Sequence, residues 1–223
     1  MGFPSPQPVV KPLIMKLQVN NLSVNRGEEQ ILSDLSFSVA TGEALIVRGA
    51  NGAGKSTLLR ALAGLLSSES GSIEIVEPEA EFADQTVSDL CHYLGGDNAM
   101  KPALSVEENL QFWQDFCGRP HLDVEEALDM VGLDGLQTVP FAHLSTGQRR
   151  RIAIARMLVS YRPIWILDEP TSGLDAASEK QFSALMQAHL EDDGLIIAAT
   201  HIPLGLASAS ELELQTFVAE SDL

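Results

Sequence analysis

Gly49-Ala50-Asn51-Gly52-Ala53-Gly54-Lys55-Ser56-Thr57 has the form G-x-x-x-x-G-K-[ST] and decides the fold. It follows the apolar run Ala44–Arg48, which predicts a strand, and it leads into residues 55–66, whose apolar spacing predicts a helix that stops near Gly64. The glycines let the backbone N–H groups face phosphate oxygens, and the helix N-terminus adds the positive end of its dipole. We therefore expect a phosphate-binding loop rather than a glycine-rich turn that binds nothing. Lys55 would reach the β- and γ-phosphates of a nucleotide, and Ser56 would ligate Mg²⁺.

A second chemical signal follows more than a hundred residues later, where Ile164-Trp165-Ile166-Leu167 runs into Asp168 and Glu169. Apolar residues that end in two carboxylates are typical of a buried strand whose carboxyl end opens into the site of an α/β sheet. By itself such a run is more often a strand that enters a solvated loop. Downstream of a phosphate loop, however, we expect Asp168 to orient Mg²⁺ or its water and Glu169 to act as general base.

The rest of the chain alternates strand and helix patterns, which predicts an α/β fold with a mostly parallel sheet. An antiparallel β subdomain is expected on the N-terminal side, and Glu- and Asp-rich residues 77–89 are expected to be a solvated connection. Capping signatures and amphipathic spacing predict a helical insert at about residues 95–142. Further strands are expected at residues 16–24, 31–39, 72–76 and 195–200, and further helices at residues 146–159 and 177–191.

Composition limits the classes of partner. The 223 residues carry 14 Lys and Arg against 31 Asp and Glu, a net charge of −17, so nucleic acid and a bare anionic bilayer are both disfavoured. No apolar run is long enough for direct membrane insertion.

Two cysteines, Cys91 and Cys117, are too few for a disulfide framework, which favours a reducing, cytosolic setting. Proline-rich residues 1–15 are expected to be a flexible N-terminal tail, or an extension upstream of a start at Met15, before a domain spanning residues 16–223.

Between the two chemical signals lies Leu144-Ser145-Thr146-Gly147-Gln148. In isolation these residues are as easily an ordinary helix cap. Placed between a phosphate loop and an Asp-Glu strand, they make residues 16–216 resemble the ATP-binding subunits of ABC transporters. The resemblance implies a P-loop ATPase of ABC type that uses ATP and Mg²⁺, forms a homodimer and drives a polytopic membrane partner. It also implies that Ser145, Gly147 and Gln148 contact the ATP held by the other subunit.

Two more positions fit the same resemblance. Ser172-Gly173-Leu174-Asp175 follows the carboxylate pair, and His201 follows the apolar strand expected at residues 195–200. The resemblance implies that Asp175 links the two sites of the dimer and that His201 contacts the γ-phosphate, although a lone histidine after a strand is more often structural. Each site would then combine two chains.

Two positions depart from the family pattern. Where the family usually has a glutamine that touches Mg²⁺ and the attacking water, this chain offers Asp97 or Asn98. Where the family usually has an aromatic residue that stacks on adenine, this chain has Arg26, whose guanidinium plane is also able to stack on a base.

Residues 94–113 are similar to the family branch that serves cytochrome c biogenesis, and Pro203 shortly after His201 agrees with that branch. This resemblance implies an ATPase at the cytoplasmic side of the cell inner membrane, peripherally bound, that drives haem export or the release of a haem-loaded chaperone. A haem chaperone complex would then be a partner. Two rival hypotheses stay open: the motor of another short ABC exporter for drugs, lipids or polysaccharides, and a soluble switch that uses ATP only to dimerise.

Two features are expected to be structural. The run Arg149-Arg150-Arg151 is expected to form a solvated helix face or to pair with carboxylates. Cys91-His92 is not a Cys-x-x-Cys-His haem attachment motif, and we expect a buried cysteine beside a surface histidine.

Overall fold

The computed structural model describes residues 15–78, 82–207 and 209–215. Residues 1–14 of the expected tail lie outside this description. Met15, which the expected tail included, is instead 2% exposed and belongs to a buried apolar cluster, because strand pairing begins at the next residue.

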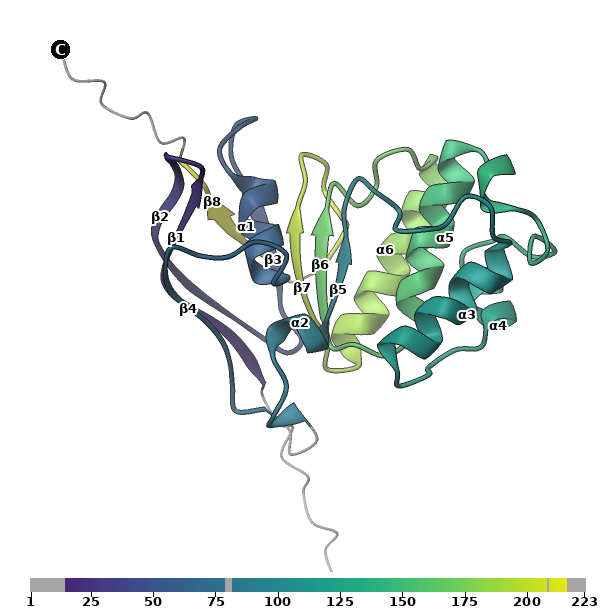
Figure 1. Cartoon of the computed structure of the whole chain (residues 1–223), viewed down its shortest axis with the longest axis horizontal. Helices are drawn as coiled ribbons and strands as arrows, with labels where there is room; N and C mark the ends of the chain where they lie inside the picture. Colours follow the sequence, from purple (N-terminus) through teal and green to yellow (C-terminus); the bar gives the residue numbers. More distant parts are fainter. Residues whose placement is uncertain (1–14, 79–81, 208, 216–223) are drawn as a thin grey trace, which may run out of the picture.

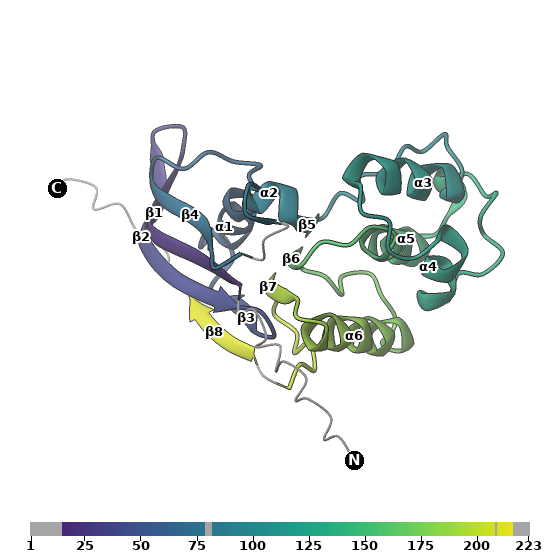
Figure 2. The same cartoon turned by 90° about the horizontal axis from the view of Figure 1, so that it is seen from below.

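Three antiparallel strands form the sheet on the N-terminal side: β1 (Lys16–Arg26), β2 (Glu29–Ala40) and β4 (Ser70–Val76), in the order β2-β1-β4. Alternate side chains of β1, such as Leu17 and Val19, are fully buried on the inner face of this sheet. Figure 2 shows the sheet curving around α1. The expected antiparallel β subdomain is confirmed.

Five strands form the second sheet, and every pairing in it is parallel. The order is β5-β6-β7-β3-β8. The strands are β3 (Ala44–Arg48), β5 (Cys91–Leu94), β6 (Ile164–Asp168), β7 (Leu195–Ala199) and β8 (Ala209–Glu213). The expected parallel core is therefore confirmed, although the sequence did not reveal β5 or β8.

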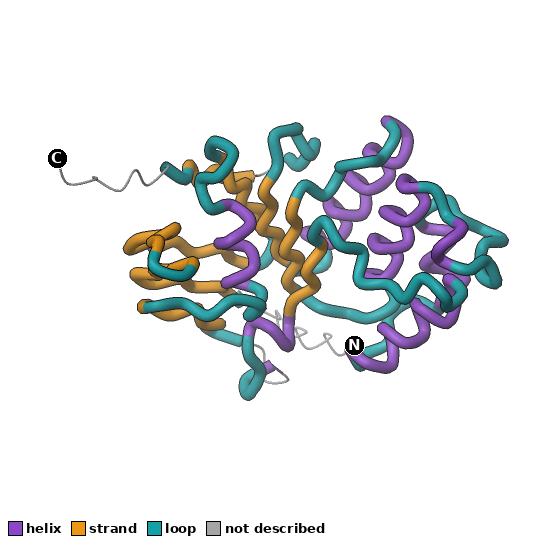
Figure 3. Tube along the Cα trace, turned by 45° about the horizontal axis from the view of Figure 1, so that its top comes forward, coloured by secondary structure: helices purple, strands orange, loops and turns teal. Residues whose placement is uncertain are grey.

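The helices occupy two layers on opposite faces of the parallel sheet (Figures 1 and 3). One layer holds α1, between the two sheets, and the other holds α3 to α6. The bounds are α1 (Lys55–Leu62), α2 (Val87–Leu90), α3 (Val106–Cys117), α4 (Val124–Met130), α5 (Thr146–Leu158) and α6 (Ala176–Glu191), with a 3₁₀ turn at Phe141–His143. No helix of the described residues is both long and apolar enough to cross a bilayer.

The parallel strands are buried on both faces, so the sheet separates two apolar clusters. In β6, Ile164 and Ile166 enter the cluster that lies toward the antiparallel sheet, whereas Trp165 and Leu167 enter the cluster formed with α3 to α6. Burial on both faces explains why β6 reads as a continuous apolar run rather than as an alternating one.

The helix after the phosphate loop ends at Leu62, close to the expected stop near Gly64. Two other local expectations were wrong. The expected solvated connection contains buried Phe82 and Val87, which pack into the cluster under the antiparallel sheet. His92 is 3% exposed rather than at the surface, because it lies on β5, and its Nε2 is 2.9 Å from the Ser160 carbonyl oxygen.

Candidate functional site

The loop between β3 and α1 has the backbone that an anion site requires. Gly54 has a φ of +95°, and a Cβ there would lie 2.9 Å from side-chain atoms of Ile31 and Leu32. Gly54 also precedes α1 without capping it through a side chain, and the first turn of α1 holds no acidic residue. By contrast, Ser105, Asp123 and other residues with oxygen-bearing side chains cap the helices after α1. The first N–H groups of α1 are thus free of side-chain acceptors, and the helix dipole favours an anion in front of them.

Lys55 lies folded back over this loop. Its Nζ donates hydrogen bonds to the carbonyl oxygens of Gly49 at 2.7 Å and Ala50 at 2.9 Å. The ammonium is therefore held beside the loop on which a phosphate would sit.

A cavity of about 380 Å³ opens in front of the loop. It gathers residues that are far apart in the sequence, from the end of β1, the loop, and the carboxyl ends of β6 and β7. Its lining consists of Arg26, Ile31, Asn51, Gly52, Gly54, Lys55, Ser56, Thr57, Arg60, Asp168, Glu169 and His201. The structure thus brings most of the residues expected on the nucleotide side of one chain to a single cavity, whereas Gly49, Ala50 and Ala53 do not line it.

Asp168 and Glu169 stand at the carboxyl end of β6. Glu169 has a φ of +45°, and its N–H donates to the Ala199 carbonyl oxygen of β7 at 2.9 Å. Its Oε1 lies 3.4 Å from Nε2 of His201, and both side chains are about half exposed, at 41% and 56%. The carboxylate and the imidazole therefore converge at the mouth of the cavity, where solvent has access.

A second cavity of about 390 Å³ adjoins the first and shares four lining residues with it, namely Ser56, Arg60, Asp168 and Glu169. Of the two residues proposed to replace the family glutamine, Asn98 lines this cavity and Asp97 does not. Asp97 lines a neighbouring groove that contains Phe112 and Trp113, and Asn98 lines that groove as well. Asn98 therefore lines a cavity together with the expected metal ligands.

Arg60 and Tyr93 are site residues that the sequence reasoning missed. The Tyr93 hydroxyl donates to Oδ2 of Asp168 at 3.4 Å, and burial raises the pKa of Tyr93. A hydrogen bond with Tyr93 raises the pKa of Arg60. Arg60 follows Ser56 by one helical turn, so the helical period placed it on the same face of α1. Tyr93 had no such signal, since β5 itself was not expected.

The arginine run differs from the expectation. Arg150 is buried rather than solvated, and Arg149, Arg150 and Arg151 donate to main-chain carbonyl oxygens rather than to carboxylates. Carbonyl groups that end strands and helices have free lone pairs, and a guanidinium carries enough donors to bind several of them.

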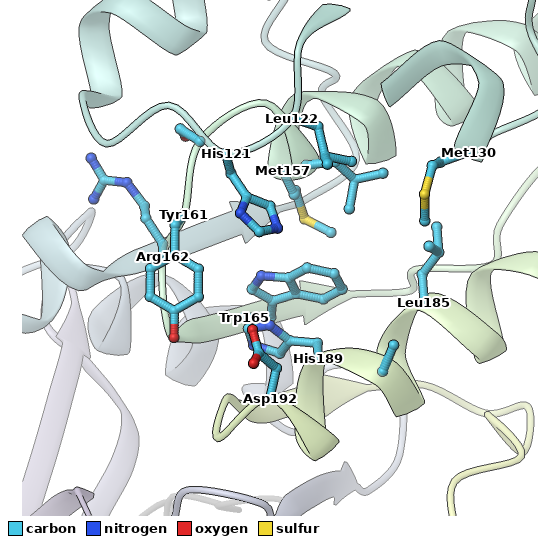
Figure 4. Close-up of a pocket in the computed structure, with 13 residues that line it drawn as sticks. His121, Leu122, Met130, Met157, Tyr161, Arg162, Trp165, Leu185, His189 and Asp192 are labelled. Atoms are coloured by element: carbon cyan, nitrogen blue, oxygen red, sulfur yellow. The ribbon is translucent and has the colours of Figure 1, made fainter. Parts of the chain in front are cut away.

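An apolar cavity of about 220 Å³ lies at the other end of β6 (Figure 4). Trp165 is at its centre and stacks on His189 at 4.0 Å between ring centroids. Burial lowers the pKa of His189 to about 4. None of the residues expected to bind nucleotide lines this cavity, so it is separate from the candidate site.

The family profile described as ABC transporter matches residues 32–172, which include the phosphate loop and the carboxylate pair. The chain belongs to the ABC transporter family. It is therefore a nucleotide-binding, ATP-hydrolysing subunit.

Curated relatives are similar over nearly their whole length. The chain is 53% identical over 209 residues to the cytochrome c biogenesis ATP-binding export protein CcmA of Brucella abortus (strain 2308), covering 94% of this chain and 96% of that protein. It is 55% identical over 200 residues to the protein of the same name from Chelativorans sp. (strain BNC1), covering 90% and 98%.

Solved structures show the same fold. A putative ABC transporter ATP-binding protein from Pyrococcus furiosus superposes with a TM-score of 0.75 at 23% identity, covering 89% of this chain and 97% of that chain. A dimeric ATP-binding cassette in a post-hydrolysis state, bound to ADP and Pi, has a TM-score of 0.70 at 25% identity, covering 83% and 88%.

The ABC residues expected to act on the partner's nucleotide lie at the starts of α5 and α6 and do not line the phosphate-loop cavity of their own chain. Ser145 caps α5: its Oγ accepts from the Gln148 N–H at 3.2 Å, and its own N–H donates to Gln148 Oε1 at 2.9 Å. Asp175 caps α6 by accepting from the Ser178 N–H at 2.8 Å, and this bond lowers the pKa of Asp175. The lining of the phosphate-loop cavity includes none of Ser145, Gly147, Gln148 and Asp175.

Proposed function

We propose that the chain is the ATP-binding and ATP-hydrolysing subunit of an ABC transporter that serves cytochrome c biogenesis. The observation that carries this proposal is the similarity to relatives of that name, above 50% identity and across at least 96% of their length. Convergence of the phosphate loop, the carboxylate pair and His201 on one cavity supports the hydrolytic part.

The residues at the cavity suit ATP with Mg²⁺. The phosphate loop, Gly49 to Thr57, would cradle the phosphates, with Lys55 over the β- and γ-phosphates. Ser56 and Asp168 line the same cavity and offer the oxygen ligands that Mg²⁺ takes beside phosphate and water. When bound, Mg²⁺ would neutralise charge that develops on the phosphates. Arg26, in the same lining, is in place to stack on adenine.

Hydrolysis would then depend on positioning and on electrostatic stabilisation. Glu169 accepts the proton of the attacking water as general base. His201, whose Nε2 lies 3.4 Å from Glu169 Oε1, orients that carboxylate and contacts the γ-phosphate. Asn98, which lines the adjoining cavity, would take the place of the family glutamine at the metal side, and Asp97 is the alternative.

The proposed active unit is a homodimer of two such subunits, each comprising residues 16–223 with a helical insert at about residues 95–142. One chain supplies the phosphate loop and carboxylates. The other supplies Ser145, Gly147, Gln148 and Asp175 to the same nucleotide. The placement of these residues outside their own chain's phosphate-loop cavity supports this division.

The proposed location is the cytoplasmic side of the inner membrane, with peripheral binding to a polytopic membrane subunit and a haem chaperone complex as a further partner. Exposed aromatic side chains on α3, in the helical insert, support the binding of a protein partner at that helix. Phe112 is 43% and Phe116 is 70% exposed, and both rings contact Trp113 on the same side of α3. Exposed aromatic clusters of this kind mark interaction surfaces.

Glu169→Gln tests the hydrolytic part. Glutamine keeps the shape of the side chain but is unable to take the proton, so turnover should fall by about 10²–10⁴-fold while ATP binding and ATP-dependent dimerisation persist. Glu74→Gln, the same change on the exposed face of β4, is the matched control and should keep wild-type turnover. Undiminished phosphate release by Glu169→Gln would exclude Glu169 as the base.

Purification of the chain from its native membrane in mild detergent tests the transport role. Recovery with a polytopic membrane subunit and a haem-handling chaperone, with haem absorbance, is the expected result. Recovery with an unrelated permease would support the ATPase activity but exclude the role in haem export. Recovery of the chain alone would favour the soluble dimerisation switch.

A further inference from the structure

Arg150 is a buried charge whose partners are main-chain oxygens. It lies on α5, is 5% exposed, and donates from Nε to the Pro170 carbonyl at 3.1 Å. Its Nη2 donates to the carbonyls of Asp168 at 3.3 Å and Glu169 at 2.8 Å. Within the described residues no carboxylate oxygen lies at ion-pair distance from it. The guanidinium therefore clamps three successive carbonyls at the end of β6, on the segment that carries the metal ligand and the base.

The middle residue of that segment needs such a clamp. With a φ of +45°, Glu169 is in the left-handed region, which is unfavourable for a residue other than glycine and persists only where neighbours fix it. The Glu169 N–H donates to Ala199 at 2.9 Å, and its carbonyl accepts from the Ser172 N–H at 3.1 Å as well as from Arg150. Arg150 thus helps to hold the unfavourable backbone that directs the Glu169 carboxylate toward His201.

The same guanidinium reaches a second loop. Its Nη1 donates to the Gly95 carbonyl at 2.5 Å, at the start of the loop that follows β5. Gly96 and Asn98, the next residues of this loop, line the cavity that also contains Asp168 and Glu169. Arg150 accordingly joins three parts of the chain: α5, the end of β6, and the loop after β5.

We propose that Arg150 is a positioning residue for ATP hydrolysis, which fixes the backbone of Glu169 and so aims its carboxylate at the attacking water. The proposal rests on the proposed function, in which Glu169 is the general base.

Arg150→Lys and Arg150→Met, made in the full chain within its complex, test this role. A lysine ammonium lacks the planar fork that binds several carbonyls at once, and methionine has no donor. We expect kcat per site to fall by about 10–100-fold with KM for ATP within about threefold, because the phosphate loop is untouched. Sites are counted from the binding stoichiometry of a fluorescent ATP analogue. Arg151→Gln is the matched control, since Arg151 donates to Val131 and Gly132 instead, and it should keep wild-type kcat.

Combination with Glu169→Gln separates positioning from general damage. If Arg150 acts through Glu169, Arg150→Lys should slow single-turnover hydrolysis by less than about twofold in the Glu169→Gln background. The proposal would be overturned if the double variant lost hydrolysis rate by the product of the two single-variant losses. Wild-type kcat in Arg150→Lys would also overturn it, as would loss of nucleotide-binding stoichiometry in both Arg150 variants, which would indicate a structural role. Absence of ATP turnover in the wild-type complex, or full turnover in Glu169→Gln, would instead contradict the proposed function itself.

Discussion

Acid should destabilise the chain through His92, which is buried on β5 as a neutral imidazole. Burial lowers the pKa of His92 from 6.5 to about 3, while a hydrogen bond to the Ser160 carbonyl opposes this shift only in part. Between these two pKa values the unfolded chain binds a proton at His92 that the folded chain does not. Stability must therefore fall as the pH drops through 6.5, and the loss continues until about pH 3.

The magnitude follows from the two pKa values. A change from about pH 7.5 to about pH 5 should cost about 2 kcal/mol of unfolding free energy through His92 alone, since each pH unit contributes about 1.36 kcal/mol. His92→Gln retains an N–H donor for Ser160 but takes up no proton. The loss on acidification should thus be about 2 kcal/mol smaller in this variant than in the wild type.

Urea denaturation followed by tryptophan fluorescence at both pH values measures the difference. Comparison with the wild type removes the contribution of every other titrating group, His189 included. His143→Gln, at an exposed position, controls for the loss of an imidazole from the chain. Equal losses on acidification in His92→Gln and the wild type would refute the reasoning.

Three further predictions concern stability, measured by the same denaturation. Gly54→Ala should destabilise the chain by about 1–3 kcal/mol and weaken ATP binding, because of the positive φ and the contact with β2; an unchanged midpoint would contradict this. Ser105→Ala removes the capping box of α3 and should cost about 1 kcal/mol, whereas no loss would mean that tertiary packing alone holds the helix start. Glu211→Gln breaks the exposed ion pair with Arg48, 3.3 Å long, and should change stability by less than about 1 kcal/mol.

The sequence predicted which residues gather at the phosphate-loop cavity because each motif there has a local cause. The glycine spacing requires a particular loop, and carboxylates after an apolar run mark the open end of a buried strand. These causes placed Lys55, Asp168 and Glu169 at one cavity without knowledge of the tertiary structure. The parallel order of the strands followed from the alternation of strand and helix.

Features that depend on distant parts of the chain were not predicted. The edge strands β5 and β8 were missed because β5 is only four residues long and the residues of β8 are mostly exposed, so neither shows a clear period. Arg150 was assigned to a solvated face because charged runs usually are. Only the folded chain shows that carbonyl groups at the carboxyl end of β6 and in the loop after β5 accept hydrogen bonds from Arg150. His92 was expected at the surface because β5, the strand that buries it, was not predicted.

The double-sided burial of β6 and β7 bears on how the chain opens. Each of the two apolar clusters packs on one face of these strands, so the loss of either cluster exposes one face of β6 and β7 to solvent. The helical layer and the antiparallel layer should consequently lose their structure together rather than as separate units. Backbone amides of β6 and β7 should then exchange with deuterium only through global unfolding. The carboxylates of Asp168 and Glu169 thus extend from the most slowly exchanging part of the chain, and the residues brought to them by the loops belong to parts that open more readily.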